Sequence, residues 1–514
     1  MTPTKTPQSK PTHSGLFAFA LLAGLFGSFL GLVAIPVFAL ADVPVWAAPL
    51  LPLAVVGAAA TLWNTQFGLC FAAFAIAPLG ILQYEFAGVT VNLPELLILA
   101  LFIKEAGRFG LNRERVARVL PRKLLLAYLM ASLVAIATGL FAGNGAVRAL
   151  QDFRQFTEYI ALYLLVLHRV SSRRQILQVL VSFLLGMTVV GFHGIAQRFT
   201  GIGIPGSQLL SDMVYHEVIR SGSFYGATPL GGMMVLAVGV AAGLALRART
   251  AKSKALAGLC AVVCVSAAVF TNTRASWLAM FVCFVFVFIS VRKTPGLVAL
   301  VVIGATLFIV TLGPVVLKRM GTLEISKRER SLLTRLRYYE AAWHIARAKP
   351  VFGLGWGCYY DITSILKNRR YVHTPMPERI RATFSSEEAT VHSAYLQLLV
   401  KTGFLGLIPF LLLLARWFLD VVRERHVADR NEQDHNLLIG IVGGLIGYLF
   451  HSGFENFFQW PVMSQSFWLL LGLSTITAAA IAHRERGRDQ EPSGCVSPPG
   501  PLVPLPSAPS DAAP

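Results

Sequence analysis

The chain has 514 residues, of which 55% are hydrophobic and 14% charged, and its mean hydropathy is +0.62. Soluble globular chains carry roughly a quarter charged residues, so this composition is typical of a membrane protein and excludes disordered, collagen-like and disulfide-rich classes for most of the chain. Long unbroken apolar runs favour a bundle of helices over an outer-membrane barrel. There are 45 Lys and Arg against 26 Asp and Glu, and the placement of this +19 surplus bears on function.

A requirement of about 20 apolar residues per span predicts an all-α, polytopic transmembrane bundle of 12–14 spans. Segment 91–103, with Pro94 and Glu95, is short and is also compatible with a re-entrant helix. In chain order, the candidate spans are 15–40, 45–63, 65–83, 91–103, 122–142, 150–168, 174–196, 228–246, 253–271, 275–291, 295–313, 395–418, 435–452 and 461–482.

These spans divide the chain into five parts. We expect a cytoplasmic N-terminal segment at 1–14, a first part of the bundle at 15–313, one large periplasmic loop at 314–393, a last part of the bundle at 394–482, and a disordered cytoplasmic tail at 483–514. Lys5, Lys10 and the following apolar stretch resemble a secretory signal, but the stretch exceeds the usual 7–15 residues of a signal core. We therefore expect an uncleaved first span.

The orientation follows from the Lys and Arg residues beside the short loops. With the N-terminus inside, 25 of them fall on the inner side and only six on the outer side, apart from fourteen in 314–393. The six are Arg148, Arg154, Arg198, Arg220, Arg274 and Lys401. Long loops cross the membrane largely regardless of charge, so that segment does not enter the comparison. Both termini are predicted to be cytoplasmic.

The 314–393 loop is basic, with fourteen Lys and Arg against seven acids. Helical spacing within it predicts an amphipathic helix at the membrane surface. We expect its apolar face to carry Leu332, Leu336, Tyr339, Trp343 and Ala346, and its polar face Arg337, Glu340, His344 and Arg347. Lys349-Pro350 ends the helix, and the glycines of 353–357 indicate a tight turn. We expect this loop to cover the polar groups at the outer face of the bundle and to exclude water from them.

Three polar clusters border the same aqueous compartment: 220–224, 271–277 and 391–395. Two arginines at one face, Arg220 and Arg274, favour a phosphate-bearing ligand because the guanidinium fork binds phosphate bidentately. His392, just before a span, suits a base that takes a proton from a hydroxyl. Snorkelling arginines and a structural histidine remain the simpler alternatives, and Arg154 with Glu158 fits an intrahelical pair.

Four motifs occur in order along the chain. They are Arg220-x-x-Ser-Phe-x-x-x-x-Pro229, Phe270-Thr-Asn-Thr-Arg274-Ala-Ser, Thr334-Arg335-Leu with Trp343 and Pro350-Val-Phe-Gly-Leu-Gly-Trp-Gly, and His392-Ser-Ala-Tyr-Leu396 with Gly403-Phe-Leu-Gly406. Over roughly residues 200–455 this set resembles the O-antigen ligase and O-antigen polymerase superfamily of bacterial inner-membrane glycosyltransferases. The first half of the chain resembles that family only in having many spans.

The resemblance implies a GT-C-like fold and a metal-independent transfer of glycan from undecaprenyl pyrophosphate to an acceptor hydroxyl at the periplasmic face, with no cofactor. Arg220 and Arg274 match the pyrophosphate-contacting arginines of the family, Arg335 matches a further basic position that binds substrate, and His392 matches the catalytic histidine. The acceptor is a lipid A core for a ligase or a growing polysaccharide for a polymerase. Two departures are Ser393, where Asn is common, and Lys401, where an acid is common.

Other function classes stay open at this stage. A protein O-oligosaccharyltransferase is a further member of the same class of enzyme. A transporter or flippase of polysaccharide or lipid precursors would place charged groups near the midplane of discontinuous helices. A non-catalytic membrane assembly protein would not depend on Arg274 or His392. The six cysteines show no metal or disulfide spacing, and we expect no nucleic-acid partner.

Overall fold

The structure is a computed structural model that describes residues 57, 59, 61, 63–86, 89–106, 121–200, 214–215, 218–291, 313, 330–357, 391–427 and 432–489. The expected spans 15–40 and 295–313, apart from residue 313, and most of 45–63 lie outside the described residues, as does the expected segment 1–14. Of the tail expected to be disordered at 483–514, residues 483–489 instead continue the last helix that the structure describes, and the rest lies outside the described residues.

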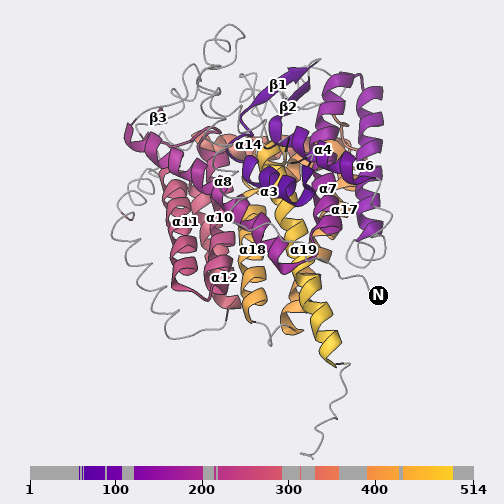
Figure 1. Ribbon diagram of the computed structural model, residues 1–514. Helices are drawn as coiled ribbons and strands as arrows, with labels where there is room; N and C mark the ends of the chain where they lie inside the picture. Colours follow the sequence, from indigo (N-terminus) through magenta and orange to yellow (C-terminus); the bar gives the residue numbers. More distant parts are fainter. Residues whose placement is uncertain are drawn as a thin grey trace, which may run out of the picture.

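The described part of the chain is a bundle of twelve α-helices with two short hairpins (Figure 1). The helices are α3 (Thr65–Ala75), α4 (Leu93–Ala106), α6 (Arg122–Phe141), α7 (Ala146–Arg169), α8 (Arg173–Thr200), α10 (Ala227–Arg247), α11 (Ala251–Phe270), α12 (Arg274–Ser290), α14 (Arg330–Ala348), α17 (Ala394–Val427), α18 (Glu432–His451) and α19 (Pro461–Asp489), with a 3-10 helix η3 (Phe457–Gln459). The strands are β1 (Gln83–Phe86), β2 (Val89–Asn92), β3 (Val214–Tyr215) and β4 (Val218–Ile219).

The all-α polytopic class is confirmed, and eleven of the fourteen expected spans coincide with a described helix. Six helices are long and apolar enough to cross a membrane, namely α6, α8, α10, α11, α17 and α19, and α3 and α12 are shorter apolar helices. The expected span 65–83 is too long, because α3 ends at Ala75 and a turn containing Pro78 and Gly80 leads into strand β1. Strands β1 and β2 pair antiparallel as a hairpin that the sequence reasoning missed.

Helix α10 is the centre of the second half of the bundle, and it packs against α8, α11, α12 and α18. Its contact with α18 is backbone to backbone. A Cβ on Gly440 would lie 2.3 Å from the Cα of Gly243, and one on Gly239 would lie 2.5 Å from the Cα of Gly444. Small residues allow helices to approach this closely inside a membrane, where van der Waals contact drives their association. The glycines therefore fix the positions of α10 and α18.

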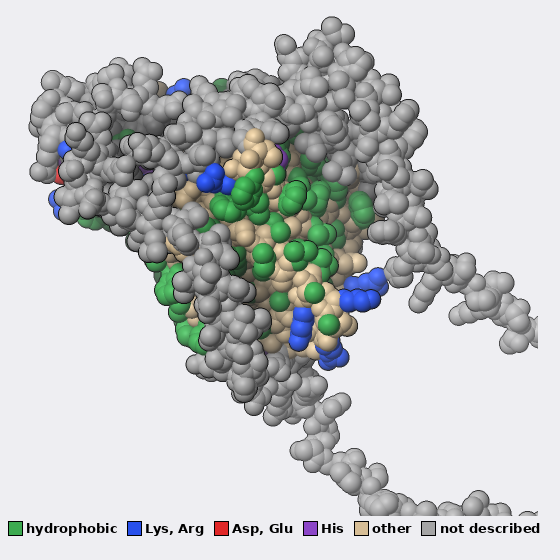
Figure 2. Space-filling model, turned by 90° about the vertical axis from the view of Figure 1, so that its left-hand side faces the viewer, with side chains coloured by type: hydrophobic (Ala, Val, Ile, Leu, Met, Phe, Trp, Pro, Cys, Tyr) green, Lys and Arg blue, Asp and Glu red, His purple; other side chains and the backbone are tan. Residues whose placement is uncertain are grey.

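Apolar side chains cover the outside of this part of the bundle. Figure 2 shows them over the side on which α8, α11 and α12 lie in Figure 1, with Lys and Arg side chains towards the ends of the face. The exposed apolar residues recur at helical spacing, for example Val181, Leu185 and Val189 on α8 and Phe281, Val285 and Ile289 on α12. A surface this apolar is suited to lipid.

The antiparallel course of the helices brings several of their ends to one end of the bundle. The starts of α10, α12 and α17 lie there with the ends of α11 and α18, as do α14 and strands β1 to β3 (Figure 1). A backbone hydrogen bond of 2.8 Å from Ala394 to the carbonyl of Ser452 ties the start of α17 to the end of α18. The three polar clusters singled out in the sequence all fall at this end.

Candidate functional site

Backbone strain marks the three polar clusters. Among the described residues, the non-glycine residues with positive φ are Ser223 (φ 50), Asn272 (φ 51) and His392 (φ 49), one in each cluster. A left-handed backbone is uncommon outside glycine and persists only where the surroundings impose it. The three clusters are therefore held in defined conformations.

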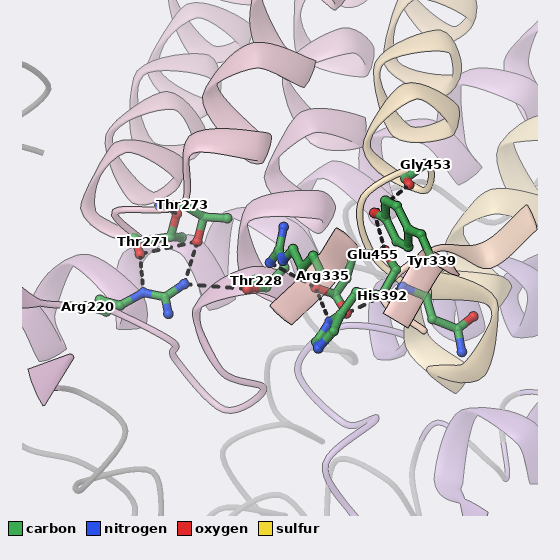
Figure 3. Close-up of polar contacts among 10 residues, drawn as sticks. Arg220, Thr228, Thr271, Thr273, Arg335, Tyr339, His392, Gly453 and Glu455 are labelled. Atoms are coloured by element: carbon green, nitrogen blue, oxygen red, sulfur yellow. Dashed lines mark hydrogen bonds and ion pairs between the residues drawn. The ribbon is translucent and has the colours of Figure 1, made fainter. Parts of the chain in front are cut away.

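Arg220 joins the first cluster to the second. Its Nε donates to the carbonyl of Thr271 at 3.2 Å, and its Nη2 donates to the hydroxyl of Thr273 at 2.9 Å (Figure 3). Nη2 also lies 3.4 Å from the hydroxyl of Thr228, at the start of α10. The guanidinium of Arg220 is thus held in a fixed orientation beside the segment that leads to Arg274.

Two helix N-termini meet at these clusters. Helix α10 begins after Gly226 and α12 begins after Thr273, and neither of these N-cap residues makes a side-chain capping bond. Arg274 is the first residue of α12, and α10 packs against α12. The first N–H groups of a helix have no partner within it and carry partial positive charge, which favours an anion. Two half-buried arginines and two helix N-termini therefore form one positive region.

The loop between Arg220 and α10 is supported by α8. Gln197 accepts hydrogen bonds from the backbone N–H groups of Gly222 and Ser223 at 3.0 and 2.9 Å. His193, one turn earlier on α8, lies 3.0 Å from the hydroxyl of Ser223 through Nδ1, and its ring stacks on Phe224 with centroids 4.1 Å apart. Neither His193 nor Gln197 is among the site residues predicted from the sequence, and Gln197 carries no signal there beyond its helical spacing from His193.

His392 is paired with a glutamate that the sequence reasoning did not single out. Its Nδ1 lies 3.1 and 3.3 Å from the two carboxylate oxygens of Glu455, which follows the end of α18. The side chain of His392 is 32% exposed and that of Glu455 is 11% exposed. The signal available was an acid placed directly after a span on the outer side, between Gly453 and Pro461.

Glu455 is an ionised carboxylate in this site. Burial raises its pKa, but the hydrogen bond to His392 and the charges of His392, Arg335 and His451 outweigh burial and bring the pKa below its ordinary value. A carboxylate on Nδ1 orients the imidazole and stabilises its protonated form. With Nδ1 on Glu455, Nε2 is the imidazole nitrogen that we expect to take part in proton transfer, on a side chain that is 32% exposed.

Helix α14 lies over the pair of His392 and Glu455. Arg335 Nη2 is 3.8 Å from a carboxylate oxygen of Glu455, and the ring of Tyr338 stacks near that of His392 with centroids 5.8 Å apart. The hydroxyl of Tyr339 donates to the carbonyls of His392 and Gly453 at 3.0 and 3.2 Å (Figure 3). Burial raises the pKa of Tyr339, so its hydroxyl stays a neutral donor. Arg335 and His392, predicted separately, are brought together here.

The expected helix in the 314–393 loop is present as α14, and its assigned faces are partly right. Ala346 is buried as expected, and Arg337, Glu340 and Arg347 are exposed as expected. Leu336 and Trp343, expected on the apolar face, are 52% and 45% exposed, and the buried face instead carries Tyr338, Ala341, Ala342 and Ile345. Helix α14 packs against α17, so its buried face is set by that neighbour as well as by the hydrophobic pattern.

Three further residues singled out in the sequence have defined surroundings in the structure. Lys401, counted among the outer charges, is buried in α17 and pairs with Asp152 of α7 at 2.9 Å. Arg154 pairs with Glu95 at 2.9 Å, while the side chain of its proposed partner Glu158 lies outside what the structure describes. Ser393, the other departure from the family pattern, lies 3.5 Å from the backbone N–H of Leu396 through its hydroxyl, the capping role that Asn also fills.

The two polar groups of this site are neighbours. Helix α18, which leads to Glu455, packs against both α10 and α12, whose first residues adjoin Arg220 and Arg274. In the described part of the chain, no three His, Cys, Asp or Glu side chains gather as a metal site would require. The arrangement offers fixed positive charge for an anion beside an oriented imidazole.

Comparison with protein families gives one match. Residues 259–411 match the family model described as O-antigen ligase, a region that includes Arg274, Arg335 and His392 and begins after Arg220. Comparison with curated proteins gives no match.

Proposed function

We propose that the chain is a member of the O-antigen ligase and polymerase superfamily and transfers glycan from an undecaprenyl-pyrophosphate donor to an acceptor hydroxyl. The match of residues 259–411 to the O-antigen ligase family model supports this proposal. The observation that carries this proposal is the pairing of His392 with the buried Glu455 beside two uncapped helix N-termini that adjoin arginines. One half of the site attracts an anion and the other half accepts a proton.

Arg220, Arg274 and the starts of α10 and α12 bind the pyrophosphate of the donor. The bond between the anomeric carbon and the pyrophosphate oxygen breaks during transfer, so negative charge grows on the leaving group. Groups fixed in advance stabilise that charge without reorganising. Arg220 meets this condition because Thr271 and Thr273 hold its guanidinium. These residues act without a metal.

His392 is the general base. Its Nε2 takes the proton of the acceptor hydroxyl as the oxygen attacks the anomeric carbon, and the undecaprenyl pyrophosphate departs with the electron pair of the broken bond. Glu455 stabilises the imidazolium that forms, since it is already ionised and in contact with Nδ1. Arg335 balances the charge of Glu455 and extends the positive region towards substrate.

Helix α14 limits access of water to this chemistry. Tyr338 and Tyr339 cover one side of His392, which leaves the imidazole 32% exposed. Water would otherwise compete with the acceptor for the activated donor. We place this end of the bundle at the periplasmic face of the bacterial inner membrane, with both termini cytoplasmic, because the Lys and Arg residues concentrate at the opposite ends of the spans.

The direct test is transfer by the purified chain in liposomes that contain the lipid-linked glycan and an acceptor. Arg220→Gln and Arg274→Gln should each reduce transfer by about 10²–10³-fold, the cost of removing one fixed charge-stabilising donor. The matched control is Arg198→Gln. Arg198 lies in the last turn of α8, outside the motifs that contain Arg220 and Arg274, so its replacement should leave transfer near the wild-type rate. Equal rates in all three variants would refute the assignment of the donor site.

The acceptor is identified by glycan analysis of a deletion strain that expresses His392→Ala. Lipid A core without polymer, together with accumulated lipid-linked chains, identifies a ligase. Core capped by a single repeat identifies a polymerase. Loss of glycan from secreted or membrane proteins alone identifies a protein O-oligosaccharyltransferase. Normal glycan in all fractions would refute the role of His392.

One observation favours a second function, the transport of polysaccharide or lipid precursors. Helix α17 is broken at Gly403, and the charged Lys401 and Asp152 lie buried beside the break, as expected for a transporter. Their charges are satisfied by each other and by the backbone of Gly357, so they are closed to a passing substrate. Movement of a labelled lipid-linked glycan across the liposome without transfer to acceptor would favour transport over catalysis.

A further inference from the structure

The segment that follows α14 starts at the surface, with Val351 and Phe352 about half exposed, and then enters the bundle at Leu354 and Trp356. We call residues 350–357 the wedge; it lies between α6, α7 and α17. The indole Nε1 of Trp356 donates to the carbonyl of Ser132 at 2.9 Å, and its backbone N–H donates to the carbonyl of Ala135 at 2.9 Å. Trp356 is fully buried. The tight turn expected from the sequence is thus a packed element.

The wedge fits a break in α17. Gly403 has φ 62 and ψ −165, so the helix is interrupted and nearby backbone groups lose their helical partners. Buried backbone groups must find other partners, above all in a membrane. The wedge supplies four bonds: Leu354 N–H to Val400 carbonyl at 2.9 Å, Gly355 N–H to Lys401 carbonyl at 2.9 Å, Phe404 N–H to Pro350 carbonyl at 2.8 Å, and Leu405 N–H to Val351 carbonyl at 3.1 Å.

An ion pair closes this junction. Lys401 Nζ lies 2.9 Å from Asp152 Oδ2, with side chains 1% and 4% exposed. The backbone N–H of Gly357 donates to the same Oδ2 at 2.8 Å, and the ammonium lies 5.5 Å from the centroid of the Trp356 ring. One carboxylate oxygen therefore connects α7, α17 and the wedge.

The wedge is joined directly to the helix that covers the candidate site. Helix α14 ends at Ala348, and its Arg335, Tyr338 and Tyr339 contact His392 or Glu455. We propose that Lys401 and Asp152 are positioning residues whose ion pair locks the wedge and thereby holds α14 over His392 and Glu455. The catalytic consequence rests on the proposed function, whereas the locking of α14 does not.

The test uses the full-length Lys401→Met, Asp152→Asn double variant, which removes both charges and leaves no unpaired buried ion. Its control is Arg416→Met, Asp420→Asn, an exposed ion pair on the same helix. Hydrogen exchange in detergent micelles should be faster for residues 335–348 in the double variant only, with α10 and α12 unchanged. Unchanged exchange in α14 would overturn the proposal, whatever reaction the protein catalyses.

The second readout is the pH dependence of transfer. The groups that face the His392 and Glu455 pair are Arg335, Tyr338, Tyr339 and His451. Loss of the Arg335 charge makes protonation of the pair easier, so Arg335→Gln should move the acidic limb of the profile to higher pH. If α14 is released, the Lys401 and Asp152 double variant should move it the same way and add little to Arg335→Gln.

A fall in rate with an unchanged profile, or shifts that add fully, would show a purely structural role and overturn the proposal. If the double variant is not recovered from membranes, Trp356→Phe keeps an aromatic ring but removes the bond to Ser132 and part of the buried indole. It should change the exchange of α14 and the pH profile in the same directions by smaller amounts, and no change in either would also overturn the proposal.

Discussion

Two ion pairs lie near the start of α17, and they differ in how far their charged groups are shielded from solvent. Lys401 and Asp152 are 1% and 4% exposed, and the backbone of Gly357 and the Trp356 ring surround them. His392 and Glu455 are 32% and 11% exposed. The two contact distances are similar, at 2.9 and 3.1 Å.

The difference in exposure indicates that the Lys401 and Asp152 pair has a structural role and the His392 and Glu455 pair a chemical one. A buried pair with every polar atom satisfied holds segments together and has no site for a substrate. A pair with a buried acid and a half-exposed imidazole keeps one nitrogen for proton transfer. Substitutions at the first pair should change stability more than chemistry, and substitutions at the second should change chemistry more than stability.

The largest expected effect is at His392. His392→Ala should reduce glycan transfer by about 10²–10⁴-fold, the usual contribution of a general base. It should lower thermal stability less than Lys401→Met does, because Glu455 keeps Arg335 at 3.8 Å and is more exposed than Asp152. Transfer assays and thermal melting in detergent measure the two effects. His344→Ala, on the polar side of α14, is the control, and a similar loss of transfer in that variant would remove the special role of His392.

Lys401→Met should have the next largest effect, on stability. It leaves the carboxylate of Asp152 buried and unpaired, which costs about 3–5 kcal/mol in the free energy of unfolding. Denaturant titration in mixed micelles measures this loss. Adding Asp152→Asn should recover most of it, because the stranded charge is then removed. If Lys401→Met alone were as stable as the wild type, the carboxylate of Asp152 would not be buried and unpaired in that variant, which would contradict the proposed role of the pair.

Glu455→Gln comes third. It keeps the shape of the side chain but loses the charge that stabilises the imidazolium, and a hydrogen bond to a charged group contributes about 1.5–3 kcal/mol. We expect a fall in the turnover number of about ten- to a hundredfold, with little change in donor KM. Glu340→Gln, exposed on α14, is a matched control. A change in KM alone would place Glu455 in substrate binding instead.

The helices were predictable from the sequence because an apolar run of span length is a local property. The arrangement at their ends was not, because it depends on pairs far apart in the chain. Glu455 meets His392 across 63 residues, and Lys401 meets Asp152 across 249. The charge count placed Lys401 on the outer side of the membrane, because the sequence does not show that Asp152 lies beside it inside the bundle.

Glycine patterns were read correctly as turns but not as contacts. Gly355 has φ 84, and a Cβ there would lie 2.1 Å from the backbone nitrogen of Gly139 on α6. The sequence indicates that glycine permits a left-handed backbone. It does not indicate which neighbouring segment lies so close that any side chain would collide with it. The resemblance to a family supplied Arg335 and His392 separately, and the structure supplied the acid that joins them.

The smallest expected effect is the pH dependence of stability that arises from Glu455. Its pKa in the folded chain is below its unfolded value, so at acidic pH the folded state binds fewer protons than the unfolded state does. The stabilisation is therefore present above the unfolded pKa and is lost as the pH falls through the folded pKa. Melting temperatures between neutral and acidic pH should fall less steeply in Glu455→Gln than in the wild type. Parallel curves would mean that the charge of Glu455 contributes only to chemistry, which would sharpen the contrast with Lys401 and Asp152.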